Sequence, residues 1–196
     1  MTLQHSSLGN WVSFIPTVLA EYDLDGQELL QDLGVIADRQ SPDSERLAVA
    51  TTAEAWRRAA IAAGDPAIGI RAAHFVQPGS WHAIGLSAIS SKNLREVVEL
   101  MSRYSAIISE AIEVSLEDCD GQLVMTVIPL AAGLPGNESL DFGLAAGVQV
   151  LRSVFPKPLN LNQVMLMRPA PANTRPYEEF FGCAVTFNND QNRLFF

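Results

Sequence analysis

Hydrophobic residues recur every three or four positions through the first part of the chain, and the breaks fall at residues that favour helix ends. This spacing predicts helices over 8–22, 27–33, 53–63 and 66–73. The third of these helices is preceded by Thr51 and Glu54, which have the spacing of a capping box. The fourth follows Asp65-Pro66, a cap residue before a proline at the first helical position. We therefore expect residues 1–75 to form a helical part.

From about residue 76 the pattern becomes a mixture of helix and strand. Asn93 and Glu96 form a second capping pair, ahead of an apolar stripe that predicts a helix over 94–108. Alternating residues on both sides of Asp120-Gly121 predict a β-hairpin. The remaining predicted elements are a helix over 140–155, a strand over 163–167, a short helix over 177–181 and strands over 184–187 and 193–196. This order predicts an α+β fold in residues 76–196, with a mainly antiparallel sheet and its helices on one side.

Composition and charge narrow the functional classes. The 196 residues are 48% hydrophobic, which is typical of a globular domain with its own core. The 13 Lys and Arg against 22 Asp and Glu give a net charge of −9, so this chain should bind neither nucleic acid nor an anionic membrane by itself. The most apolar amino-terminal run has no preceding Lys or Arg, and the two cysteines are too few for a disulfide framework. We expect a cytoplasmic location and no membrane segment.

A search for catalytic or metal-binding patterns finds none strong enough to assign an enzyme. His5, His74 and His82 have no further ligand-type residue at a recognised spacing. The D-x-D-G runs at 23–26 and 118–121 lack the other oxygen ligands of a calcium loop, so we interpret them as turns and caps. A small enzyme that uses His82 and a serine is the weakest hypothesis. No cofactor and no metal are expected.

Four longer segments carry a more specific signal, because they match one family in the same order. They are Gly64-Asp65-Pro66 through Ala73; Gly85-Leu86-Ser87 through Arg103-Tyr104; Arg168-Pro169-Ala170-Pro171 through Phe187; and Asn192 through Phe196. Together they resemble the arabinose-binding-like amino-terminal domain of AraC/XylS-type transcriptional regulators. Two positions depart from that pattern: Asn93 stands in place of a threonine cap, and Met167-Arg168 stands where a histidine is frequent.

This resemblance implies the effector-binding and dimerising domain of a regulator. It implies a homodimer that meets DNA only through a helix-turn-helix domain, which regulators of this kind carry beyond this domain and which is absent from this chain. A small molecule that binds one conformer more tightly would then control how the DNA-binding modules are presented.

The effector pocket is expected near the turn at Trp81-His82. The candidate residues for effector binding are Trp81, His82, Tyr104, Met125 and Phe142, with Arg103 or Arg168 to meet a carboxylate. An apolar or aromatic acid is favoured over an ornithine-like ligand, because Asp141 is the one acidic residue that falls within an apolar stripe. The alternative function is a protein-interaction domain that uses the apolar face of the helix over 140–155. An enclosed pocket distinguishes the two hypotheses.

Overall fold

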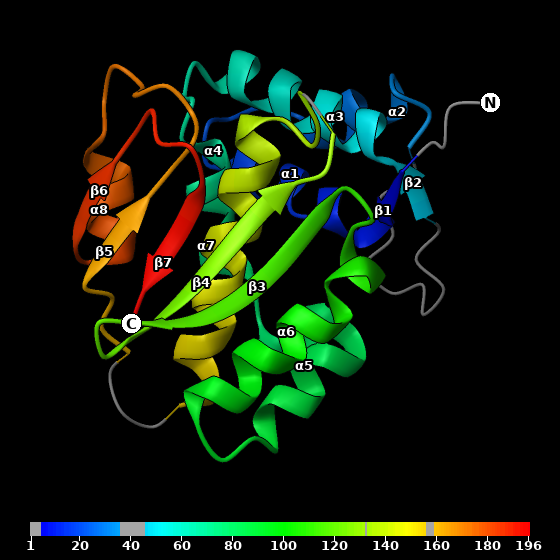
Figure 1. The fold of residues 1–196 in the computed structure, drawn as a ribbon. Helices are drawn as coiled ribbons and strands as arrows, with labels where there is room; N and C mark the ends of the chain where they lie inside the picture. Colours follow the sequence, from blue (N-terminus) through cyan, green and yellow to red (C-terminus); the bar gives the residue numbers. More distant parts are fainter. Residues whose placement is uncertain (1–4, 36–45, 132, 156–158) are drawn as a thin grey trace.

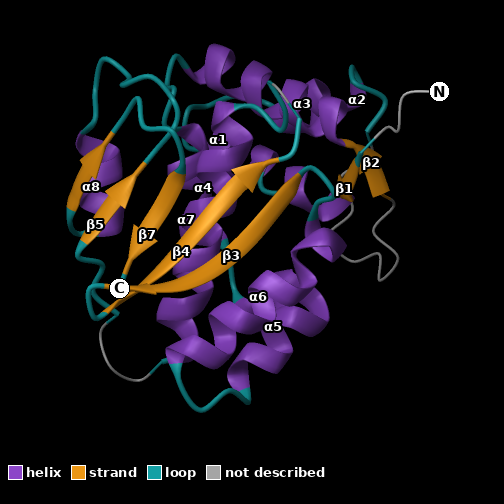
Figure 2. Cartoon of the chain, in the orientation of Figure 1, coloured by secondary structure: helices purple, strands orange, loops and turns teal. Residues whose placement is uncertain are grey.

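The computed structural model describes residues 5–35, 46–131, 133–155 and 159–196, with backbone alone at 82–84. A five-stranded sheet lies on one side of the molecule, and helices pack against one of its faces (Figure 1). The strand order is β3-β4-β7-β5-β6. The cartoon coloured by secondary structure shows the same separation of sheet and helices (Figure 2). The α+β class is confirmed.

The helical part begins with a short strand instead of a helix. Strand β1 (Ser6–Leu8) pairs antiparallel with β2 (Arg46–Ala48), and a 3₁₀ turn (Gly9–Val12) follows β1. Helix α1 (Ile15–Ala20) therefore covers less than half of the predicted 8–22 helix. Pro16 explains where α1 starts, because a proline without a backbone N–H fits in the first turn of a helix and breaks one further along.

The other early helices are α2 (Gly26–Gln31), α3 (Val49–Ala63) and α4 (Ile68–Ala72). The predicted capping box at Thr51 and Glu54 is wrong. Helix α3 begins at Val49, two residues before Thr51, and its N-cap residue is Ala48. The carboxylate of Glu54 accepts hydrogen bonds from Arg57 Nε at 2.7 Å and Arg58 Nε at 2.8 Å. Charge pairing along the helix, and not end capping, is therefore what holds Glu54.

In the second part the local signals were more accurate. Asn93 caps α6 (Leu94–Ile108): its side-chain oxygen accepts from the backbone N–H of Glu96 at 3.0 Å. The hairpin of β3 (Ile112–Cys119) and β4 (Gln122–Pro129) is confirmed. Its two turn residues have φ of 50° at Asp120 and 81° at Gly121, as a tight hairpin requires. Helix α5 (His82–Ile89), after a 3₁₀ turn at Pro78–Trp81, was not predicted.

The carboxyl-terminal elements complete the sheet. They are β5 (Gln163–Met165), α8 (Arg175–Phe181), β6 (Ala184–Thr186) and β7 (Asn192–Phe195). Strand β7 lies between β4 and β5 and is antiparallel to both, whereas β5 and β6 are parallel and are joined through α8. A short α-helical crossover is the expected connection for one parallel pair.

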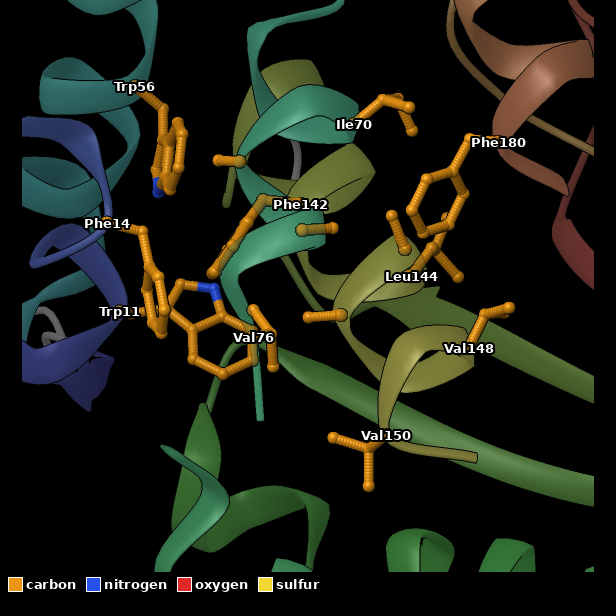
Figure 3. Close-up of a cluster of buried hydrophobic side chains, with 14 of the residues drawn as sticks. Trp11, Phe14, Trp56, Ile70, Val76, Phe142, Leu144, Val148, Val150 and Phe180 are labelled. Atoms are coloured by element: carbon orange, nitrogen blue, oxygen red, sulfur yellow. The ribbon is translucent and has the colours of Figure 1, made fainter. Parts of the chain in front are cut away.

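Helix α7 (Asn137–Val154) joins the two parts through a shared core. The ring of Phe142 on α7 lies 5.0 Å from Trp11, 5.3 Å from Phe14 and 4.6 Å from Trp56, measured between ring centroids (Figure 3). Helix α4 also approaches α7 closely, since a Cβ on Gly69 would lie 2.3 Å from the carbonyl oxygen of Glu138. The apolar face of α7 is thus buried inside the domain and cannot be the docking surface of the interaction hypothesis.

Candidate functional site

A cavity of about 60 Å³ lies between the sheet and the helices. Its sheet side is made of apolar side chains from the β3–β4 hairpin: Ile112, Val114, Met125 and Val127. The remaining walls come from residues of β1 and the 3₁₀ turn after it, from α3, α6 and α7, from Trp81 and from Pro135. Because residues far apart in sequence meet here, both parts of the chain contribute to one cavity.

Hydroxyl groups gather at one end of this cavity. The buried side chains of Ser7 on β1 and Thr52 on α3 share a hydrogen bond of 2.9 Å between their hydroxyl oxygens. Ser109 lies opposite Ser7 in an isolated antiparallel bridge, and Ser105 is one helical turn before Ser109 on α6. Ser139 adds a hydroxyl from α7. We refer to Ser7, Thr52, Ser105 and Ser109 as the hydroxyl cluster.

Two tryptophans and two glycines form another wall. The rings of Trp11 and Trp81 have centroids 5.9 Å apart. They lie over Gly143 and Gly147, which are one turn apart on α7, and a Cβ at either glycine would stand 3.5 Å from the neighbouring ring. The indole N–H of Trp81 is buried and has no hydrogen-bond partner among the described residues. A buried donor of this kind is costly unless something else accepts from it.

The described lining residues carry no charged side chain. An apolar wall with a few polar groups is typical of small-molecule sites. In the described part of the chain, no group of three or more His, Cys, Asp or Glu is placed to hold a metal ion. The arrangement can therefore bind a small molecule through shape and hydrogen bonds, and it offers no acid–base group for catalysis among those lining residues.

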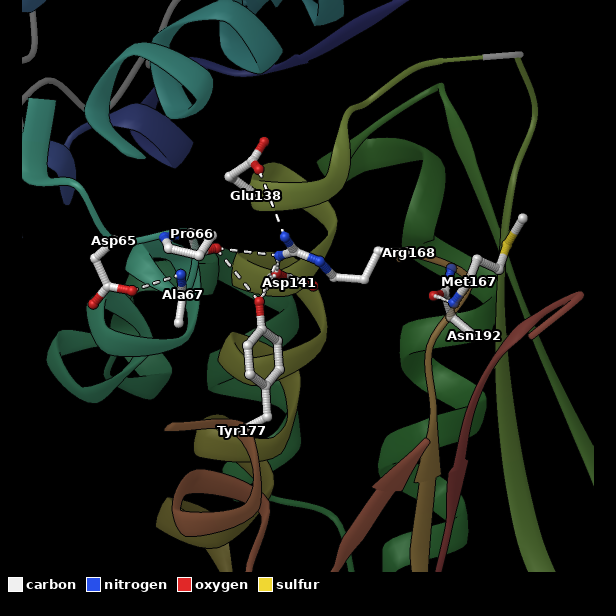
Figure 4. A network of polar contacts seen from close by, with 9 residues as sticks. All are labelled: Asp65, Pro66, Ala67, Glu138, Asp141, Met167, Arg168, Tyr177 and Asn192. Atoms are coloured by element: carbon white, nitrogen blue, oxygen red, sulfur yellow. Dashed lines mark hydrogen bonds and ion pairs between the residues drawn. The ribbon is translucent and has the colours of Figure 1, made fainter. Parts of the chain in front are cut away.

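A separate buried polar network lies on the other side of α7 (Figure 4). Arg168 donates to the carboxylate of Asp141 and to the phenol oxygen of Tyr177, the latter at 2.5 Å. The Tyr177 hydroxyl donates to Asp141 at 2.7 Å, and a Glu138 carboxylate oxygen lies 3.9 Å from Arg168. Arg168 also donates to the backbone carbonyl of Pro66 at 3.2 Å, which ties this network to the loop before α4.

Burial and pairing act in opposite directions in this network. Complete burial raises the pKa of Asp141 to about 6, while Arg168 and Tyr177 favour its ionised form. Burial opposes the charge on Arg168, but the Asp141 carboxylate holds the pKa of Arg168 above its ordinary value. Burial, with Asp141 acting in the same direction, also raises the pKa of Tyr177. At neutral pH the network is an ion pair with a neutral phenol, and the Nε–H of Arg168 is buried with no hydrogen-bond partner among the described residues.

The structure brings together two of the seven candidate residues, since Trp81 and Met125 both line the cavity. Phe142 is fully buried in the aromatic core, and Arg168 belongs to the buried network. Arg103 and Tyr104 are exposed on α6, with Tyr104 38% accessible. His82 is the first residue of α5, and its side chain lies outside the described residues.

Sequence reasoning missed the hydroxyl cluster and the two glycines. One signal was present: Ser105 is a small polar residue that interrupts the apolar stripe of α6 between Met101 and Ile108. Such an interruption indicates a place where the helix faces a cavity or a buried polar partner. Ser7 and Thr52 gave no comparable pattern, because their neighbourhood depends on the β1–β2 pairing.

Comparison with known proteins agrees with this fold. The family model described as the arabinose-binding domain of AraC transcription regulators, N-terminal, matches residues 24–196. The ornithine utilization regulator of Pseudomonas aeruginosa is 25% identical over 174 residues, which cover 87% of this chain and 50% of that protein. The chain thus spans about half the length of this curated relative.

A solved structure resembles the fold. The crystal structure of the transcriptional regulator CdpR from Pseudomonas aeruginosa superposes with a TM-score of 0.53 at 14% identity, over 88% of this chain and 55% of that one. Among the described residues, no helix is long and apolar enough to cross a membrane. With the family match extending over most of its length, the chain belongs to the family of arabinose-binding amino-terminal domains of AraC transcription regulators.

Proposed function

We propose that this chain is the small-molecule-sensing domain of an AraC-type regulator, and that its effector binds in the cavity between the β3–β4 hairpin and α7. The observation that carries the proposal is the lining itself: buried, apolar and shared between elements of both parts of the chain. Trp81 and Met125 remain in the proposed site. Arg103 and Tyr104 are exposed, Phe142 lies in the core and Arg168 belongs to the buried network, so none of these four lines the proposed cavity.

The small volume of the cavity suggests how binding would act. A ligand larger than a few water molecules must widen a cavity of about 60 Å³, either by displacing lining side chains or by moving α6 or α7 relative to the hairpin. A ligand shifts an equilibrium only by its difference in affinity for the two conformers. Binding would then stabilise the wider conformer and change how a DNA-binding module is held. Contact with DNA through such a module, a homodimer and a cytoplasmic location are parts of the same proposal.

The test is a thermal-shift screen of the purified chain with sugars, basic amino acids, fatty acids, aromatic acids and uncharged alcohols. A ligand at 100 times its Kd adds about 2.7 kcal/mol to stability, which is several degrees for a domain of this size. The matched variant is Gly143→Ala with Gly147→Ala, which adds two methyl groups to the cavity wall. The proposal predicts that a stabilising ligand loses its effect in this variant. An equal shift in both proteins would show that the ligand binds elsewhere.

A further inference from the structure

We infer that the cavity takes an uncharged ligand with a narrow hydrocarbon body and an oxygen acceptor at one end. This inference rests on the proposed function and concerns the chemistry of the same site. Three independent features of the lining carry it: the shape and apolarity of the walls, the hydrogen-bond donors that the protein leaves unused, and the lack of a charged partner among the described lining residues.

The walls select the body of the ligand. Side chains such as Val114 and Met125 on the hairpin face the tryptophan wall, so an apolar group between them would contact carbon on both sides. The volume of about 60 Å³ is less than half the ~150 Å³ of an engineered cavity that holds a benzene ring. An unbranched chain needs less width than an aromatic ring, so it displaces the lining side chains least.

The polar groups select the end of the ligand. Each hydroxyl has one hydrogen to donate and two positions that accept. Within the Ser7–Thr52 pair one hydroxyl donates to the other, and the contacts among the described residues leave the second O–H of the pair for a ligand oxygen. The indole N–H of Trp81 is a donor only and is likewise unpartnered in that part of the structure. Alcohol, ketone, ester and lactone oxygens can accept a hydrogen bond from either of these donors.

The absence of a charged partner selects against ionised ligands. A carboxylate or an ammonium group that leaves water for an apolar site without a counter-charge is strongly disfavoured. None of the described lining residues is acidic or basic. Arg168 was a candidate to bind a ligand carboxylate, but it is already paired with Asp141 in the buried network. The sequence favours an apolar or aromatic acid as the effector. The cavity agrees with the apolar part of that expectation, but none of its described lining residues could pair with an acid group.

The experiment compares three probes with the same six-carbon chain at neutral pH: 1-hexanol, hexanoate and hexylammonium. Each is titrated into the ¹⁵N-labelled chain, and the indole N–H signals of the three tryptophans are followed by NMR. We expect 1-hexanol to move the Trp81 signal. Trp56 is the internal control, because its indole N–H is also buried and unpartnered among the described residues but does not line the cavity. Hexanoate and hexylammonium should bind at least about 100-fold more weakly.

Two variants test whether the Ser7–Thr52 hydroxyl pair donates a hydrogen bond to the ligand oxygen. Ser7→Ala combined with Thr52→Val removes both hydroxyls of the pair and should weaken 1-hexanol about 5- to 10-fold. Thr51→Val is the matched control, since Thr51 is next to Thr52 on α3 and is not a lining residue. Equal or tighter binding of either ionised probe overturns the inference, and so does the failure of all three probes to bind.

The proposed function fails in a different way. If 1-hexanol binds equally well to the chain and to the Gly143→Ala, Gly147→Ala variant, the binding is not in the cavity, and the location of the effector site is wrong. If an ionised probe binds tightly but only to the unchanged chain, the cavity remains the site and the ligand class alone is overturned.

Discussion

The ring of Trp81 lies 3.5 Å from the point where a Cβ on Gly147 would stand. That distance is ordinary van der Waals contact, so an alanine fits without displacing the tryptophan. Glycine at this place in α7 keeps space open beside the ring, and it does so at the expense of helix stability.

Gly147→Ala is therefore expected to make the chain more stable and the cavity smaller. Alanine in a helix interior is favoured over glycine by up to about 1 kcal/mol, and the new methyl group adds apolar contact with Trp81. Urea unfolding should show a higher midpoint with an unchanged slope. A gain in stability together with a loss of ligand binding would mean that the glycine serves the site. Lower stability would mean that α7 and Trp81 are packed more tightly than this distance indicates.

The buried network predicts a strong dependence on its single arginine. Arg168→Met should destabilise the chain by about 3–5 kcal/mol, because it leaves the Asp141 carboxylate buried without a counter-charge. The double variant with Asp141→Leu should lose less, since both charges are removed together. Urea unfolding of all three proteins gives the comparison.

An exposed pair provides the control for that cycle. Arg175 and Glu179 lie 2.6 Å apart on α8 with side chains 80% and 60% accessible. Arg175→Met should change stability little, because water screens such pairs and solvates each partner well. Similar losses at Arg168 and Arg175 would contradict the assignment of the first pair as a buried connection between α7 and the loop before α4.

The carboxylate of Asp65 predicts a loss of stability in acid. Partial burial raises its pKa, but hydrogen bonds from Arg71 and Tyr22 outweigh this, so that its pKa lies below the ordinary 3.8. The folded state thus holds the proton less tightly than the unfolded chain. The contribution of the Asp65 carboxylate to folding stability is therefore complete above about pH 4, and it is lost as the pH falls through the lowered pKa. Asp65→Asn should cost about 1–2 kcal/mol near neutral pH and progressively less in acid.

The partner of Asp65 titrates at the other end of the pH range. Burial and the hydrogen bond to Asp65 raise the pKa of Tyr22 from 10.0 to about 12. Its contribution is present below pH 10 and is lost as the pH rises through 12. Unfolding curves measured from acid to alkaline pH check both the loss of stability at Asp65 in acid and the loss at Tyr22 in alkali. A constant difference between the unchanged chain and Asp65→Asn at every pH would contradict this interpretation.

Helix capping predicts unequal effects at two similar sequence patterns. Asn93→Ala should cost about 1 kcal/mol, because it leaves the Glu96 N–H at the start of α6 without its acceptor. Thr51→Ala should change stability little, since Thr51 lies inside α3 and is not its cap. Equal losses at the two positions, measured by thermal unfolding, would show that the start of α3 differs from the one described.

The elements that could be predicted from sequence depend on neighbours within a few residues. The Asn93 cap and the Asp120-Gly121 hairpin are of this kind, because the groups that bond are set by local spacing. The β1–β2 pair could not be found in this way, since its strands have three residues each and lie 40 positions apart. The T-x-x-E pattern at Thr51 failed because arginines further along α3 compete for Glu54.

The cavity could not be predicted from the sequence, because its lining residues are also far apart along the chain. Trp81 and Met125 were identified from a turn and a strand, but Ser7 and Thr52 meet only after β1 and α3 have packed together. Arg168 was expected to meet a ligand carboxylate, and the carboxylate that it meets is Asp141, 27 residues away in sequence. An arginine pairs readily with a carboxylate, and here the tertiary packing supplies Asp141 as that partner.

The central position of β7 in the sheet governs when the domain can form during synthesis. Residues 192–195 form β7, which lies between β4 and β5. Strands β4 and β5 are not hydrogen-bonded to each other, so only β7 connects them. A ribosome that has released only the first 190 residues has therefore made two separate strand pairs with open edges. The nascent chain must keep those edges from foreign strands until residues 192–195 emerge, so removal of these four residues divides the sheet instead of trimming it.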